Sequence, residues 1–249
     1  MSALVASELL KLRTTRTFYG VTGAAAGIIL LIVILTSALA PWEAGDQPLL
    51  SALGVAGFVQ IFALVIGILA VSTEVRHGTI TPSLLAVPNR VRFIGSKFIA
   101  NGVAGLLLGL VTSLLCWAFA AGIFSARGID SEAGSGELLQ AIIGNGIASA
   151  LFAILGVGLG ALIRNQAGAI VAALVYMLVI ENLLGAIPGL DEFVPQFGIN
   201  GSSTALTAGS DDFSVDNQLG QIPGGLVFAA WAALFAAAGT AMLRRRDVS

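Results

Sequence analysis

Six long apolar runs constrain this chain more than any other feature of its sequence. A helix needs about 20 consecutive apolar residues to cross the hydrocarbon core of a bilayer, which is about 30 Å thick. The segments that meet this requirement are 20–40, 49–71, 98–124, 138–163, 167–187 and 222–243. A closed β-barrel would show short alternating segments instead. The sequence therefore predicts an all-α integral membrane protein with six transmembrane helices, forming a single transmembrane domain over residues 1–249.

The composition agrees with a surface that faces lipid. Only 10% of the 249 residues are charged and 57% are hydrophobic, whereas a typical water-soluble domain has about 25% charged residues. The formal net charge is −2, so the chain has no basic excess of the kind that binds nucleic acid. The expected partner is the lipid bilayer, and nucleic acid is not expected.

The basic residues predict the orientation, because cytoplasmic loops carry an excess of Lys and Arg. If the N-terminus is cytoplasmic, every Lys and Arg except Arg127 lies on the cytoplasmic side. These residues are Lys11, Arg13, Arg16, Arg76, Arg90, Arg92, Lys97, Arg164, Arg244, Arg245 and Arg246. The loops on the other side carry most of the acidic residues. We therefore expect both termini in the cytoplasm.

Residues 1–19 have the pattern of an amphipathic helix, which predicts a helix lying on the inner leaflet. The two faces are formed by Val5, Leu9 and Leu12 on the apolar side and by Glu8, Lys11 and Thr15 on the polar side.

The loop 72–97 is the longest connection on the cytoplasmic side, and its sequence predicts a short helix. Gly78 allows a turn where the chain leaves the second span. Thr81 is a good N-cap, and Pro82 suits the first helical position because its missing N–H has no partner there anyway. Pro88 then ends the helix. The side chains that this helix offers to a partner are Leu84, Leu85 and Val87, and the flanking charges are Glu74, Arg76, Arg90 and Arg92.

This loop carries a resemblance. The run EVRHGTITPSLLAVPNR, which begins at Glu74 and is followed by Arg92 and Lys97, resembles the signature loop of ABC transporter permeases of the ABC-2 type. In that family a Glu, a Gly-Thr pair, a Leu-Leu pair and a Pro-x-Arg lie between the second and third of six spans. The segment Glu8-Leu9-Leu10-Lys11-Leu12-Arg13 similarly resembles the amphipathic elbow helix of the family.

The resemblance implies a permease subunit of an ATP-driven exporter in a cell membrane, expected to be the bacterial inner (cytoplasmic) membrane. It implies a second permease subunit, identical or different, and separate ATP-binding cassette subunits that hold ATP and Mg²⁺. The chain has no G-x-x-x-x-G-K-[ST] sequence to cradle phosphates, so we expect no enzyme activity, cofactor or metal in this chain. The residues implied in coupling to the ATPase are Glu74, Gly78, Thr79, Thr81, Pro82, Leu84, Leu85, Pro88 and Arg90. The other interpretation of the loop is a basic connection that only sets topology.

Five polar residues within the spans are candidates for a substrate path: Gln60, Asn101, Asn145, Glu181 and Asn182. The alternative for the amides is hydrogen bonding between helices. For Glu181, the one charged residue in the six runs, the alternatives are a polar point at an outward-facing mouth, a side chain that reaches the outer interface, or a bond to a neighbouring helix.

Three G-x-x-x-G pairs that lie within the predicted spans allow close helix packing, either within the bundle or between subunits. They are Gly23/Gly27, Gly105/Gly109 and Gly156/Gly160. With 31 glycines in the chain, such pairs do not by themselves locate a dimer contact.

The structure of the external segment 188–221 stays open in the sequence. The segment fits either short re-entrant helices or an irregular loop.

A gradient-driven transporter or channel is the second functional hypothesis, although such proteins usually place ionisable residues near the midplane. An intramembrane enzyme is less compatible, because the spans hold no His and no paired acids. The substrate cannot be read from the sequence.

Overall fold

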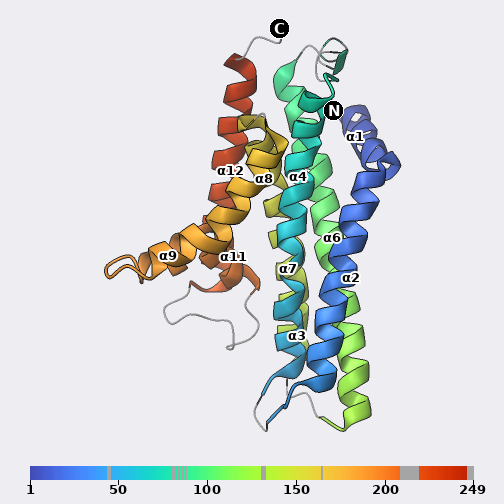
Figure 1. Ribbon diagram of the computed structural model, residues 1–249, viewed down its shortest axis with the longest axis vertical. Coiled ribbons are helices and arrows are strands. Elements are labelled where there is room, and N and C mark those ends of the chain that lie inside the picture. The colour runs from blue at the N-terminus through green and yellow to red at the C-terminus, as the bar shows by residue number, and fades with distance from the viewer. Residues whose placement is uncertain are drawn as a thin grey trace.

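Helices make up nearly all of the computed structural model, which describes residues 1–43, 46–79, Pro82, Ser83, Leu85, Val87, 89–129, 133–163, 165–207 and 219–245. These residues contain no strand. The elements are α1 (Ser2–Thr14), α2 (Arg16–Leu39), α3 (Pro48–Ala56), α4 (Val59–Arg76), α6 (Arg90–Arg127), α7 (Ser135–Leu162), α8 (Gln166–Val175), the π-helix η1 (Tyr176–Ile180), α9 (Glu181–Gly185), α10 (Phe193–Phe197), α11 (Ile199–Thr207) and α12 (Gln221–Arg245). They form an elongated helical bundle (Figure 1).

Six helical stretches of the described residues are long and apolar enough to cross a membrane. They are Arg16–Leu39, Pro48–Arg76, Arg90–Arg127, Ser135–Leu162, Gln166–Gly185 and Gln221–Arg244. The prediction of an all-α protein with six spans is therefore confirmed.

The connection between the second and third spans is shorter than the predicted loop 72–97. α4 extends into the first residues of that segment, and α6 begins at Arg90 and runs for 38 residues. The side chain of Asn89 accepts a hydrogen bond from the backbone N–H of Arg92 at 3.1 Å, which caps the first turn of α6. The helices extend beyond the apolar runs because basic residues such as Lys97 end an apolar run without ending the helix.

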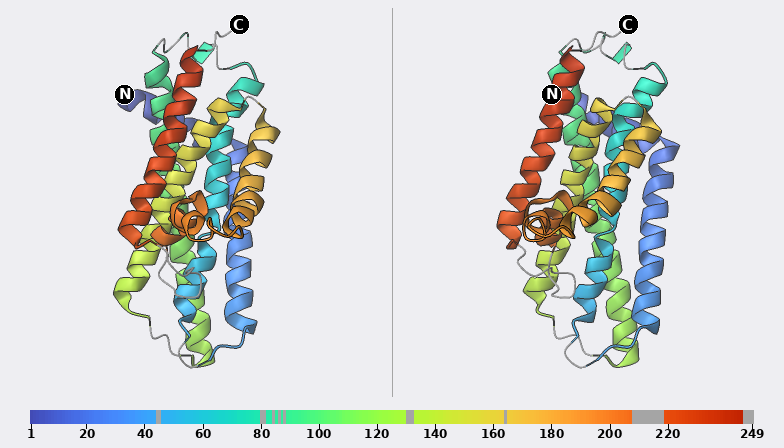
Figure 2. Two further views of the ribbon diagram at one scale, coloured as in Figure 1. Left: turned by 90° about the vertical axis from the view of Figure 1, so that its left-hand side faces the viewer. Right: turned by 60° about the vertical axis from the view of Figure 1, so that its left-hand side comes forward.

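α7 is the central helix of the bundle and packs against α4, α6 and α12 (Figure 2). Glycines make this packing close. A Cβ at Gly156 would lie 2.2 Å from the carbonyl oxygen of Leu64 in α4, and a Cβ at Gly109 would lie 2.7 Å from the carbonyl oxygen of Asn145 in α7. The backbones of neighbouring helices therefore touch directly at these positions.

The three G-x-x-x-G pairs have different surroundings. Gly105 and Gly109 lie against α7, whereas Gly156 and Gly160 lie against α4. For Gly23 and Gly27 of α2, a Cβ would meet nothing within 4 Å among the described residues. Two pairs thus serve packing within the subunit, and the pair on α2 stays open.

The second span is broken, although its sequence reads as one apolar run. α3 ends at Ala56 and α4 begins at Val59. The amide of Gly57 bonds to the carbonyl of Gly54 at 3.0 Å, and the side chain of Asn145 donates to the carbonyl of Leu53 at 2.9 Å. The side-chain amide of Asn145 in α7 thus satisfies the backbone carbonyl of Leu53 at the break.

The fifth span also departs from a regular helix and leads into a segment that folds back. It consists of α8, η1 and α9 in succession. After it, α10 and α11 return to the bundle, where α11 packs against α7 and α12 about halfway along the long axis (Figure 1). Trp231 of α12 donates its indole N–H to the carbonyl of Phe197 at 2.8 Å. The part of segment 188–221 that the structure describes is therefore largely helical and packed, not an irregular loop.

α1, the end of α4, the start of α6 and the end of α12 all lie at one end of the bundle (Figure 1). We call this the basic end, because it includes Lys11, Arg76, Arg90 and Lys97. The chain bends between α1 and α2 at Thr15, whose backbone is extended.

Candidate functional site

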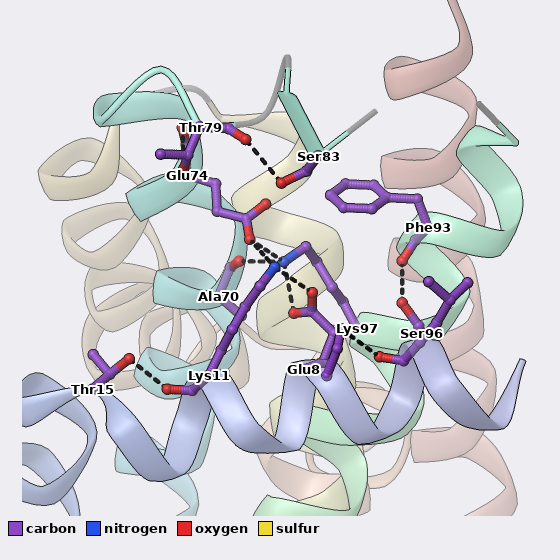
Figure 3. Close-up of polar contacts among 12 residues, drawn as sticks. Glu8, Lys11, Thr15, Ala70, Glu74, Thr79, Ser83, Phe93, Ser96 and Lys97 are labelled. Carbon is purple, nitrogen blue, oxygen red and sulfur yellow. Dashed lines mark hydrogen bonds and ion pairs between the residues drawn. The ribbon is translucent and has the colours of Figure 1, made fainter. Parts of the chain in front are cut away.

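Four charged side chains from three helices meet at the basic end (Figure 3). We call Glu8 and Lys11 of α1, Glu74 of α4 and Lys97 of α6 the charged cluster. Lys97 Nζ lies 2.8 Å from Glu8 Oε2 and 2.8 Å from Glu74 Oε1, and it also donates to the carbonyl of Ala70 at 3.1 Å. Lys11 Nζ lies 2.7 Å from Glu8 Oε1 and 3.0 Å from Glu74 Oε1. The cluster therefore joins α1 to the second and third spans.

The burial of the cluster is uneven. The side chain of Lys97 is 1% exposed, whereas that of Lys11 is 48% exposed. Lys97 Nζ also lies 5.0 Å from the centroid of the Phe93 ring, within the range of a cation–π contact. Lys97 is thus the buried centre of the cluster, and Lys11 lies at its edge.

One residue of the expected polar face of residues 1–19 does not face water. Glu8 is buried, whereas Lys11 and Thr15 are exposed. The helix turns its carboxylate inward because two lysines are there to pair with it, and an unpaired buried carboxylate would be costly. The sequence pattern could not show this, since Lys97 lies far from α1 along the chain.

The two charges on α1 have shifted pKa values. Burial acts to raise the pKa of Glu8, but the charge of Lys97 and the hydrogen bonds from Lys11 and Lys97 outweigh it, so the pKa lies below the usual 4.5. Burial acts to lower the pKa of Lys11, but its hydrogen bonds to Glu8 and Glu74 outweigh it, so the pKa lies above the usual 10.5. Both groups are charged at neutral pH.

These shifts predict how stability depends on pH. A depressed carboxyl pKa stabilises the fold above pH 4.5, and this contribution is lost as pH falls through the folded-state value. We expect Glu8→Gln to lower the free energy of unfolding by about 1–3 kcal/mol at neutral pH. The difference from wild type should shrink as pH falls below 4.5. Thermal stability in detergent, measured for both proteins across this range, checks it; a difference that stays constant down to low pH would contradict it.

The connection after Glu74 begins with the turn that the sequence predicts. Gly78 has a φ of 68°, a left-handed conformation that favours glycine. The amide of Thr79 bonds back to the carbonyl of Glu74 at 3.0 Å. Three described residues that follow have helical backbone, namely Pro82, Ser83 and Leu85. Thr81, Leu84 and Pro88, which the sequence also implicates in coupling, lie outside the described residues.

Leu85 and Arg90 have different surroundings. Leu85 is 79% exposed. Arg90 lies outside the charged cluster, and its Nη1 donates to the carbonyls of Leu243 at 2.8 Å and Arg244 at 3.4 Å. A guanidinium at these carbonyls satisfies the end of α12 and suits the helix dipole. Arg90 thus ties the start of α6 to the last span.

A second polar region lies farther along the bundle, where the second and fifth spans are irregular. A cavity of about 260 Å³ is lined there by Gln60 of α4, Asn182 of α9, and Asn200 and Ser203 of α11, among others. We call it the mid-bundle cavity. The π-helix leaves the carbonyl of Met177 to accept from the side chains of Asn182 and Asn200. π-helical turns are frequent at functional sites.

The structure brings three of the five predicted path residues together. Gln60 and Asn182 line the mid-bundle cavity, and Asn145 accepts a hydrogen bond from Gln60 at 3.4 Å. Glu181 is buried beside them but is engaged by α11: its Oε1 accepts from the backbone N–H of Asn200 at 2.7 Å and from that of Gly201 at 3.3 Å. Of the alternatives for Glu181, this geometry supports a bond to a neighbouring helix rather than a polar point at an outward-facing mouth.

Asn101, the fifth predicted path residue, lies elsewhere. It is buried at the basic end and lines a cavity that it shares with Glu74 and Lys97. Its Nδ2 donates to the carbonyl of Lys97 at 2.9 Å. The predicted set is therefore divided between two regions of the bundle.

Sequence reasoning missed the pairing of Glu8 with Lys97 and the part played by Asn200. The signal for Lys97 was weak but present, because it is a charged residue directly before an apolar run. Asn200 belongs to the external segment, and only the return of α11 brings it to the fifth span.

Comparison with known proteins gives one family. The sequence model of the ABC-2 family transporter proteins matches residues 4–180. This range covers more than half of the chain and contains all four residues of the charged cluster. No curated protein was found to match the chain. The charged cluster and the six spans thus belong to a multi-pass membrane protein of the ABC-2 transporter family.

Proposed function

We propose that this chain is the permease subunit of an ATP-driven exporter in a bacterial cytoplasmic membrane. It pairs with a second permease subunit, and separate ATP-binding cassette subunits bind and hydrolyse ATP. Membership of the ABC-2 family supports the transport role. The basic end of the bundle is the cytoplasmic side in this proposal, as the distribution of Lys and Arg predicts.

The connection between α4 and α6 is the contact with the ATPase in this proposal. The observation that carries it is the position of Leu85, which is 79% exposed and has helical backbone, as do Pro82 and Ser83, after the turn at Gly78. The turn at Gly78 is bonded to Glu74 through Thr79. A displacement of the segment therefore acts on Glu74, and through Lys97 on α6 and α1.

The mid-bundle cavity is the part of the substrate path that the subunit contributes. Its walls combine amide and hydroxyl groups with apolar side chains. The flanking helices are interrupted at Gly57 and at the π-helix 176–180.

Leu85→Asp tests the ATPase contact. The charge is expected to reduce copurification of an ATP-binding cassette subunit about tenfold, as the loss of an anchoring side chain at an interface does. The protein's own thermal stability should not change, because the residue is exposed. The measurement is the amount of ATPase, and of ATP hydrolysis, recovered with the tagged protein from the cells that produce it.

Leu10→Asp is the matched control, since Leu10 is also an exposed leucine of the basic end. It should leave copurification unchanged. Wild-type levels of ATPase with Leu85→Asp would refute the contact at this segment. Transport that persists in ATP-free vesicles under an ion gradient would instead support the gradient-driven alternative and refute the exporter.

A further inference from the structure

A cavity of about 350 Å³ adjoins the charged cluster at the basic end. Its lining comes from α1, α2, α4, α6 and the connection after α4. One part of the wall is polar and includes Glu74, Lys97 and Asn101; another is apolar and includes Phe18 and Leu69. A mainly apolar pocket with one polar part suits an amphiphile, a molecule with a polar head group and a hydrocarbon chain.

Two buried acceptor atoms in this lining have no hydrogen-bond partner among the described residues. They are Glu74 Oε2 and Asn101 Oδ1. Asn101 is 1% exposed, and its Nδ2 is already used on the carbonyl of Lys97. Buried polar atoms are normally satisfied, and each one that is not calls for an explanation. Both atoms are acceptors, so the occupant that satisfies them brings hydrogen-bond donors.

The charges of the cluster restrict the head group further. Two carboxylates and two ammonium groups cancel, so a head group with a net charge would be buried without a counter-charge, which is unfavourable. A zwitterion avoids this cost. Lys11 uses two of its donors on Glu8 and Glu74, and a lysine has three. The remaining donor of this half-exposed side chain suits the anionic part of a zwitterion.

The cavity reaches the surface at the joint between α1 and α2. Thr15 and Thr17 line it and are exposed. Its volume is near the lower end of the range for ligand pockets, so it accepts a head group while the hydrocarbon chain continues outside. Phe18 and Val21 of α2, which also line it, lie where such a chain would leave.

We propose that this cavity binds the head group of a zwitterionic amphiphile that carries a primary ammonium. The ammonium donates to Glu74 Oε2 and Asn101 Oδ1, and the anionic group of the amphiphile lies near Lys11. Phosphatidylethanolamine has this chemistry, whereas phosphatidylcholine has the same phosphate but no N–H. The cavity is also lined by Thr79 and Ser83, so an occupant touches the connection proposed to contact the ATPase. This contact between the occupant and the ATPase connection rests on the proposed function, whereas the binding of the head group in the cavity does not.

The test compares these two lipids on the purified permease alone. The protein is extracted from vesicles that contain equal amounts of phosphatidylethanolamine and phosphatidylcholine, and the retained lipids are quantified by mass spectrometry. We expect about tenfold enrichment of phosphatidylethanolamine, the ratio that corresponds to about 1.4 kcal/mol. Asn101→Leu, which removes one acceptor at similar volume, should bring the ratio close to one. Asn182→Leu alters an asparagine of the mid-bundle cavity and should leave it unchanged.

Equal retention of both lipids by the wild-type protein would overturn the proposal, and this result does not depend on how well Asn101→Leu folds. A preference that survives in Asn101→Leu would also overturn the assignment to this cavity. A second experiment distinguishes a resident bilayer lipid from a soluble amphiphile as the occupant of the cavity. In it, single-chain lysophosphatidylethanolamine is titrated into nanodiscs of phosphatidylcholine that contain the protein. Binding that bilayer phosphatidylethanolamine blocks identifies a resident lipid, and binding that it does not block identifies a soluble amphiphile. Failure to copurify an ATPase would refute the proposed function and leave this measurement untouched.

Discussion

Lys97→Met is expected to lower the free energy of unfolding by about 3–5 kcal/mol, the usual cost of removing one partner from a buried ion pair. Lys97 is 1% exposed, and its Nζ holds both Glu8 and Glu74 at 2.8 Å. Without it, two carboxylates from different helices face each other with Lys11 as the remaining cation of the cluster. Thermal stability in detergent and the yield of monodisperse protein measure the effect.

Two controls separate the loss of the charge from the loss of the side chain. Lys11→Met removes a cation that is 48% exposed, so it should cost only about 0–1 kcal/mol. The triple variant Lys97→Met, Glu8→Gln, Glu74→Gln removes the buried lysine together with both carboxylates. It leaves only Lys11, which is 48% exposed, and it should recover much of the lost stability. If Lys97→Met proved as stable as the wild type, the cluster would not hold α1 in place.

Gly156→Val has the second large expected effect. A Cβ at this position would lie 2.2 Å from the carbonyl oxygen of Leu64 and 3.0 Å from the amide nitrogen of Ile68. Both atoms are backbone, so α4 and α7 must separate to admit it. Overpacking of a core typically costs about 1–3 kcal/mol, and we expect the upper part of that range or more because no side chain can move aside. The measurement is again thermal stability in detergent.

Gly27→Val is the matched control, because a Cβ there meets nothing within 4 Å among the described residues. The two substitutions change the same residue type within G-x-x-x-G pairs, and only the surroundings differ. Gly27→Val should leave the subunit's own stability unchanged. Equal destabilisation by both would show that the effect comes from helix propensity and not from the contact of α7 with α4.

The spans could be predicted from the sequence because the bilayer imposes a length of apolar chain that few other structures need. The interruptions inside them could not be predicted in the same way. Asn145 satisfies the carbonyl of Leu53 at the break between α3 and α4, and these residues are far apart in sequence. The length of an apolar run shows whether a segment can cross a bilayer, but it does not show where the backbone hydrogen bonds of the helix are interrupted.

The candidate site was predictable only in part. The turn at Gly78 follows from local chemistry, since glycine accepts a positive φ. The pairing of Lys97 with Glu8 depends on how α1 folds against α6, and no local pattern specifies that contact. For the same reason Asn101 and Gln60 were equally good candidates for a substrate path by sequence alone, although they line different cavities.

The return of α11 has a consequence for the order in which the protein is made. The amides that bind Glu181 belong to Asn200 and Gly201, which are synthesised 19 and 20 residues after it. The fifth span therefore leaves the ribosome with its carboxylate unsatisfied. α11 in turn packs on α12. This region therefore cannot be completed until α12 has been synthesised, and a nascent chain halted before α12 leaves exposed a carboxyl group that is buried in the folded protein.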